Sequence, residues 1–78
     1  MREYLVKLRE ARGVLSSDIC RATGLKLPMY SLVEHGKRTA TLKFLTKIAD
    51  YYGINLSELI LAEVRYRDSC GKMWGIEE

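Results

Sequence analysis

The sequence of 78 residues predicts an all-α domain that is built from five short helices. Apolar residues recur every three or four positions along most of the chain, whereas no alternating pattern indicates a strand. Glycines follow several of these apolar segments, at positions where helices commonly end. Within residues 13–38, two short apolar segments meet at Thr23-Gly24, and helices that short bury an apolar face only by packing on each other. These observations together indicate one compact helical fold.

The first predicted helix spans about residues 2–12. Leu5, Leu8 and Ala11 share its apolar face, and we expect the charged side chains, Arg2 among them, to lie around that face. Gly13 follows at the position where a left-handed residue commonly ends a helix.

The second and third predicted helices are the short pair. The second begins at Ser16 or Ser17, because either hydroxyl can accept from the free N–H groups of a first turn, and it ends at Thr23-Gly24. The third spans residues 28–34, with a proline that is tolerated in the first turn. Two such helices packed at a steep angle form a helix-turn-helix, which places the second of them where it can enter a DNA major groove.

The fourth and fifth predicted helices complete the domain. Thr41 is expected to cap the fourth, and Gly53 to end it. Its apolar face is expected to carry Leu42, Leu45, Ile48, Ala49 and Tyr52. The fifth is expected to face inward with Leu56, Leu59 and Ile60 and to continue through Arg67.

The domain boundary is expected at residue 64, so that residues 1–64 form the helix-turn-helix domain and residues 65–78 a C-terminal extension. Aromatic and large apolar residues of this extension have two interpretations. They are Tyr66, Met73, Trp74 and Ile76. In the first interpretation they form a dimer contact, which we favour because small operator-binding proteins use two half-sites. In the second they fold back over the core of the domain.

Composition excludes several classes of protein. The chain contains no apolar run near 18 residues and no signal segment, so we expect a cytoplasmic protein that does not enter a membrane. Cys20 and Cys70 are too few for a disulfide framework or a zinc site, and the one histidine has no apparent nucleophile partner. We therefore expect no catalysis, no metal and no cofactor. A net charge of +3 permits a polyanionic partner without requiring one.

An ordered set of motifs resembles a known family. The motifs are Leu8-Arg9, Gly13, Gly24, Glu34-x-Gly36-Lys37-Arg38, Ile48-Ala49, and the segment from Gly53 to Leu59. With this order and spacing, the chain resembles the lambdoid phage repressor and Cro family, or XRE-type helix-turn-helix, over about residues 5–60. The resemblance implies a five-helix globule that binds double-stranded operator DNA, commonly as a homodimer. It thus implies a small transcriptional regulator from a prokaryotic or phage setting.

The resemblance also implies an ion pair between Arg9 and Glu34, which in this family joins the first helix to the end of the third. An arginine fork can satisfy a carboxylate while its stem packs in the core. The alternative is that both are solvated surface charges.

A basic cluster around the start of the fourth helix is a candidate contact to DNA phosphates. It consists of Lys37, Arg38, Thr39, Thr41 and Lys43. A helix N-terminus offers free N–H groups and a positive dipole end, and neighbouring cations strengthen the attraction to phosphate. Ser16 and His35 are further candidates for backbone contact. The alternative is an ordinary solvated basic loop.

The third helix departs from its family. Counted from Gly24, the positions that usually read bases in the resembled family are Leu27, Pro28, Ser31 and Leu32, and Lys26 lies beside them. Family members tend to carry hydrogen-bonding side chains there, because base edges are distinguished by their donors and acceptors. Two hypotheses follow. The apolar side chains contact thymine methyl groups, with DNA shape supplying further specificity. Alternatively, the exposed apolar face of this helix binds a protein partner, as in an antitoxin-like interaction module or a regulator's partner.

Overall fold

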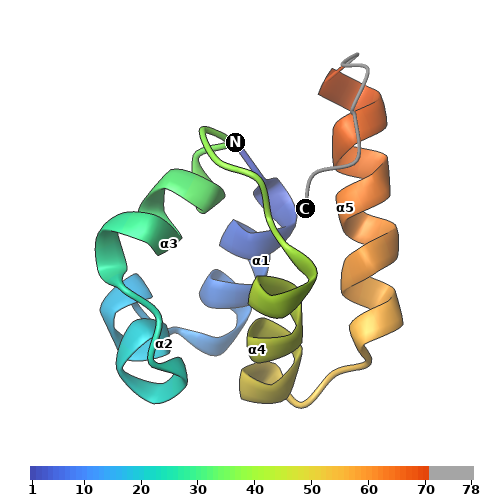
Figure 1. Ribbon diagram of the computed structural model, residues 1–78. Helices are drawn as coiled ribbons and strands as arrows, with labels where there is room; N and C mark the ends of the chain where they lie inside the picture. Colours follow the sequence, from blue (N-terminus) through green and yellow to red (C-terminus); the bar gives the residue numbers. More distant parts are fainter. Residues whose placement is uncertain (71–78) are drawn as a thin grey trace. The chain divides into compact units, whose positions relative to one another are not determined.

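The computed structural model describes residues 1–70, which form five α-helices and no strand (Figure 1). The helices are α1 (Glu3–Arg12), α2 (Ser16–Thr23), α3 (Leu27–Glu34), α4 (Leu42–Tyr52) and α5 (Leu56–Cys70). The predicted all-α, five-helix fold is confirmed. The chain divides into two compact units, of which the first, Met1–Thr39, holds α1 to α3 and the second, from Ala40 onward, holds α4 and α5.

In the first unit, α3 packs against both α1 and α2 (Figure 1). Four side chains of these helices, Leu5, Ile19, Tyr30 and Val33, are essentially inaccessible to solvent. Because each helix is short, this shared burial rather than intrinsic helix propensity holds the three together. Leu5 lies at the centre of the predicted apolar face of α1, whereas Ala11, expected on the same face, is exposed.

The turn between α2 and α3 depends on Gly24, whose φ of +80° lies in the left-handed region. Its N–H donates to the carbonyl of Cys20 over 2.9 Å and so closes the last turn of α2. The Thr23 hydroxyl supports the same corner, since it donates to the carbonyl of Ile19 over 2.7 Å. The predicted end of α2 at Thr23-Gly24 is therefore confirmed.

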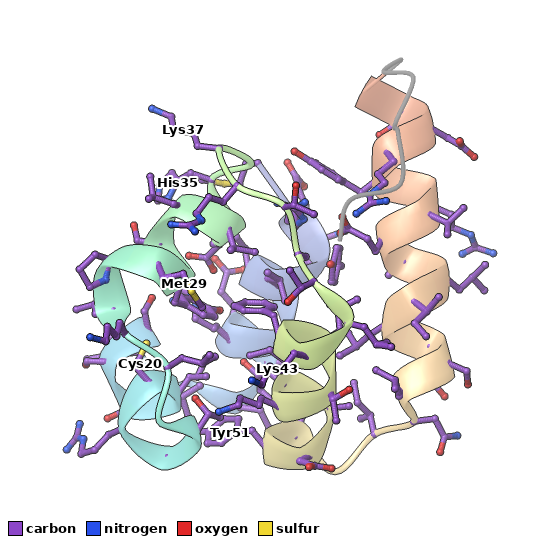
Figure 2. All side chains as sticks on the ribbon, viewed as in Figure 1. Cys20, Met29, His35, Lys37, Lys43 and Tyr51 are labelled. Atoms are coloured by element: carbon purple, nitrogen blue, oxygen red, sulfur yellow. The ribbon has the colours of Figure 1, made fainter. Side chains whose placement is uncertain are left out.

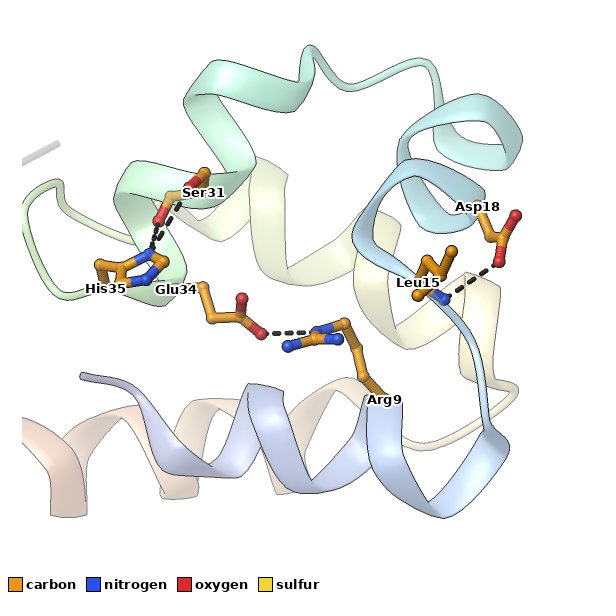
Figure 3. Close-up of polar contacts among 6 residues, drawn as sticks. All are labelled: Arg9, Leu15, Asp18, Ser31, Glu34 and His35. Atoms are coloured by element: carbon orange, nitrogen blue, oxygen red, sulfur yellow. Dashed lines mark hydrogen bonds and ion pairs between the residues drawn. The ribbon is translucent and has the colours of Figure 1, made fainter.

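Helix α2 begins at Ser16, as predicted, but its cap differs from the prediction. Leu15 occupies the capping position and no side chain caps the helix there, so a serine cap at Ser16 or Ser17 is wrong. Asp18 instead reaches back, and its Oδ2 accepts the N–H of Leu15 over 3.0 Å (Figure 3). A carboxylate in the first turn also interacts favourably with the helix dipole.

In the second unit, α4 and α5 pack against each other. Thr41 caps α4 as predicted, because its Oγ1 accepts the N–H of Phe44 over 3.1 Å. The buried residues of α4 are Phe44, Leu45, Ile48, Ala49 and Tyr52. Two predicted core residues lie outside instead: Leu42 is 61% exposed and Ile60 is 39% exposed. Both stand at the edge of their helix's apolar stripe, where spacing alone does not separate buried from exposed positions.

Helix α5 continues three residues beyond Arg67, to Cys70. Arg67 Nε donates to Glu63 Oε2 over 3.1 Å, one helical turn away, and this pair supports the extension. The helix crosses residue 64, the boundary expected from sequence, without interruption. Met73, Trp74 and Ile76, three of the residues expected to form a dimer contact or to cover the core, lie outside the described residues.

Candidate nucleic-acid interface

Helix α3 has a buried side and an exposed side. Tyr30, Val33 and Glu34 are buried, whereas Leu27 and Leu32 are 45% and 39% exposed. Pro28 is also exposed, and Ser31 is half-buried. The four positions predicted from the count after Gly24 therefore lie on or beside the solvent-facing side of α3.

The N-terminal end of α3 carries a cation. Lys26 occupies the capping position with an extended backbone, its side chain is exposed, and its carbonyl accepts the N–H of Tyr30 over 2.9 Å. The dipole of α3 adds a partial positive charge at the same end. The lysine and the helix dipole together favour an anion at the start of α3. The phosphates of DNA are anions of this kind.

Hydrogen-bonding groups on the exposed side of α3 are few, and two of them interact with each other. His35 Nδ1 lies 2.8 Å from the carbonyl oxygen of Ser31 and 3.5 Å from its Oγ (Figure 3). An Nδ1–H that donates to the carbonyl leaves Nε2 as the ring atom that can meet an outside partner. His35 thus extends the polar part of α3 by one turn.

The loop after α3 presents two basic side chains. The N–H of Gly36 donates to Val33 and the N–H of Lys37 donates to Leu32, over 3.0 and 2.8 Å, so the loop folds closely onto the helix end. The side chains of Lys37 and Arg38 are exposed, and Lys37 points away from the ribbon (Figure 2). Thr39, the last residue of the first unit, is half-buried.

The remaining candidate phosphate contacts lie at two helix starts. Ser16 is the first residue of α2 and is half-buried. Thr41 and Lys43 belong to the second unit, where both are exposed at the start of α4. The Thr41 oxygen accepts the N–H of Phe44, and its hydroxyl can still donate to a phosphate oxygen.

The ion pair between Arg9 and Glu34 is present. Arg9 Nε donates to Glu34 Oε2 over 2.7 Å, with the two side chains 21% and 5% exposed (Figure 3). It links α1 to the last residue of α3, and because both groups are largely withdrawn from water the contact is screened little by salt.

Arg2 is the residue that sequence interpretation missed. It was expected among the solvated charges around α1, yet its exposure is 0%. Its Nη1 donates to the carbonyls of Val33 and Arg38, over 2.6 and 2.8 Å. The available signal was spacing, since Arg2 precedes the buried Leu5 by three residues, although it stands just before the first residue of α1.

Cys20 is buried, and the loss of hydration raises the pKa of its thiol above the ordinary value of 9.0, which makes it a poor nucleophile. Within residues 1–70, no group of histidine, cysteine and acidic residues is arranged to hold a metal ion. None of the helices in this part of the chain has the length and apolar character needed to cross a membrane.

Comparison with known proteins agrees with this geometry. A family described as helix-turn-helix matches residues 5–59, which include the whole of α2 and α3. The chain is 33% identical over 66 residues to the HTH-type transcriptional regulator DdrOP3 of Deinococcus deserti. That alignment covers 85% of this chain and 51% of the relative, so the chain spans about half the length of the curated relative. No solved structure matches the chain significantly.

Proposed function

We propose that this chain, which belongs to the helix-turn-helix family, is a small transcriptional regulator that binds double-stranded DNA at specific sequences. The observation that carries the proposal is the exposed side of α3, which stands between a cationic start at Lys26 and a basic loop at Lys37 and Arg38. An α-helix fits the DNA major groove, which is about 12 Å wide. The name of the relative DdrOP3 supports the same class of protein.

Affinity in this proposal comes mainly from phosphate contacts. Lys37 and Arg38 approach the DNA backbone at the end of α3, while Lys26 does so at its start. Each contact releases condensed counterions, so binding weakens as salt rises. These contacts carry no sequence information, but they fix how α3 enters the groove.

Specificity is proposed to come from apolar contact. Leu27, Pro28 and Leu32 have no hydrogen-bonding side-chain group to present to a base edge, whereas a thymine methyl group offers them an apolar surface. Ser31 and Lys26 supply the polar contacts. We therefore expect half-sites rich in A·T pairs, with groove shape adding to the preference.

A second copy of this chain is the proposed partner in DNA binding. Helix α5 exposes Ile60, Leu61 and Val64, which lie within one helical turn of each other. In an antiparallel pair of α5 helices, Glu58 of one copy lies near Arg65 of the other, whereas a parallel pair opposes like charges. Leu61→Glu is expected to convert a dimer to a monomer in sedimentation without loss of helicity. A wild-type protein that sediments as a monomer at every concentration contradicts this proposal.

A second candidate function rests on the exposure of Leu27 and Leu32. Two large apolar side chains on one helix face also suit a protein partner, as in an antitoxin-like module. The DNA proposal is preferred because lysines and an arginine flank the same helix at both ends. Neither role requires catalysis, and a prokaryotic regulator of this kind acts in the cytoplasm.

Selection from a random pool of duplexes at low salt tests the proposed function. Enrichment of an A·T-rich motif is the expected result, with two such motifs about one helical turn apart if the protein binds as a dimer. Failure to enrich any sequence, together with recovery of a stoichiometric protein partner that Leu32→Ala no longer binds, favours the second candidate.

A further inference from the structure

We infer that Arg2 is a positioning residue that holds the loop of residues 36–39 against the end of α3. This inference rests on the proposed function only for its consequence in DNA binding, since the loop carries Lys37 and Arg38. Arg2 itself is fully buried, so it cannot touch a phosphate from where it lies.

The geometry of the contact supports this role. One guanidinium nitrogen, Nη1, donates to Val33 in α3 over 2.6 Å and to Arg38 in the loop over 2.8 Å. An arginine Nη carries two hydrogens in a fixed plane, so a single nitrogen can bridge two carbonyls. The backbone N–H of Arg2 adds a third bond, to the carbonyl of Glu34 over 2.7 Å. The start of α1 is thus joined to both the end of α3 and the loop that follows it.

Electrostatics makes an arginine well suited to this position. The C-terminal end of α3 carries the negative end of the helix dipole, and its last carbonyls lack partners within the helix. A buried cation that binds these carbonyls offsets its own loss of hydration. Loss of the guanidinium therefore releases a loop carbonyl and leaves the end of α3 without its cation.

The consequence concerns Lys37 and Arg38. Their side chains are exposed and long, and they contact a phosphate efficiently only if their backbone is fixed beforehand. With Arg2 in place, the carbonyl of Arg38 is held, so the loop does not have to be ordered when DNA binds. Removal of Arg2 should weaken binding to every DNA sequence equally.

The first test measures the loop without DNA. Trypsin cleaves after Arg38, where the carbonyl of the susceptible bond is the one that Arg2 holds. In Arg2→Met we expect cleavage there to accelerate about tenfold or more relative to cleavage after Arg21 in α2, because a charge-assisted hydrogen bond is lost locally. Lys7→Met, which removes an exposed cation from α1, serves as the charge-matched control and should leave the ratio unchanged. Equal acceleration at Arg21 and Arg38 would mean general destabilisation and overturn the inference.

The second test measures DNA binding in a double-mutant cycle. Arg2→Met should reduce affinity for a duplex of any sequence about tenfold in the wild-type background, and very little once Lys37 and Arg38 are both alanine. An equal loss in both backgrounds overturns the inference. A wild-type protein that binds no DNA overturns the proposed function instead, while the trypsin ratio still decides whether Arg2 holds the loop.

Arg2→Lys keeps both tests decisive if Arg2→Met does not fold. Lysine retains the charge but lacks the planar pair of hydrogens, so its trypsin ratio and its DNA affinity should fall between wild type and the loss expected for Arg2→Met. A lysine variant identical to wild type in both measurements contradicts the bridging role.

Discussion

Arg9 and Glu34 connect α1 to the last residue of α3 through a bond of 2.7 Å between Nε and Oε2. Since Glu34 is almost fully buried, removal of Arg9 leaves a carboxylate without this partner in a poorly hydrated place. We expect Arg9→Met or Glu34→Gln to cost about 3–5 kcal/mol of unfolding free energy, and a double-mutant cycle by urea denaturation to show strong coupling.

The exposed pair of Asp18 and Arg21 is the matched control for this cycle. Its atoms are 2.9 Å apart, close to the distance in the buried pair, but both side chains are well exposed. Its coupling energy should therefore be about 0.5 kcal/mol or less. Coupling of that size between Arg9 and Glu34 would show that burial adds nothing to their contact.

Lys37, Arg38 and Lys43 are expected to provide affinity that does not depend on sequence. Each alanine substitution that removes a phosphate contact should lower the slope of log affinity against log salt by about one unit. Fluorescence anisotropy with a labelled duplex at several salt concentrations measures this slope. Lys7→Ala removes the same charge at an exposed site of α1 and should leave the slope unaltered. Slopes equal to wild type in all three variants would rule out the phosphate contacts.

Leu32→Ala should weaken binding to the selected sequence while binding to unrelated DNA stays nearly unchanged. The expected loss lies near the low end of 1–3 kcal/mol per base pair, because one apolar contact to a thymine methyl group is at stake. Leu15→Ala, which truncates an exposed leucine at the start of α2, is the control. If Leu32→Ala binds every duplex as wild type does but no longer captures a protein partner, α3 is a protein-docking face.

Gly53→Ala should destabilise the fold by about 1–2 kcal/mol, because φ at this position is +69° and left-handed backbone is unfavourable for alanine. Apart from Gly53 and its two chain neighbours, no heavy atom lies within 4 Å of the site of an added Cβ, so the cost is conformational rather than steric. Gly53→Asn should lose less, since asparagine tolerates this conformation better. Urea denaturation of the two variants measures the difference, and equal losses would point to a cause other than φ.

Cys20 makes stability depend on alkaline pH. Burial raises the pKa of its thiol, so above the ordinary value of 9.0 the unfolded thiol ionises before the folded one does. The unfolded state then gains stability, and the free energy of unfolding should fall as pH rises above 9, by at most about 1.4 kcal/mol per pH unit. Cys20→Ala lacks this contribution, so the difference between wild type and variant should shrink over that range. A difference constant with pH would contradict the burial effect.

The helix ends were predictable from sequence because their signals are local. Gly24 and Gly53 end α2 and α4 in left-handed conformation, and Thr41 caps α4 through its own side chain. Each of these effects depends on one residue and the backbone beside it, so neighbouring sequence is enough to predict it.

Burial was less predictable, because it depends on neighbours that are remote in sequence. Leu42 and Ile60 have the spacing of core residues and are nevertheless exposed, since packing and not periodicity decides where an apolar stripe ends. Arg2 shows the opposite error. Two of the groups that accept from the Arg2 guanidinium are backbone carbonyls, and no pattern of side chains in the sequence reveals them. The charge of Arg2 was therefore the only signal considered, and it suggested a solvated residue.

The two sides of α3 have separate tasks under the proposed function, because one is buried in the fold and the other faces solvent. Tyr30, Val33 and Glu34 serve the interior, whereas Leu27 and Leu32 stand in solvent. Substitution of an exposed residue away from such contacts usually changes stability by no more than about 0.5 kcal/mol. If the exposed side of α3 selects the target as proposed, a duplicated copy can acquire a new target by changes on that side without an unstable intermediate.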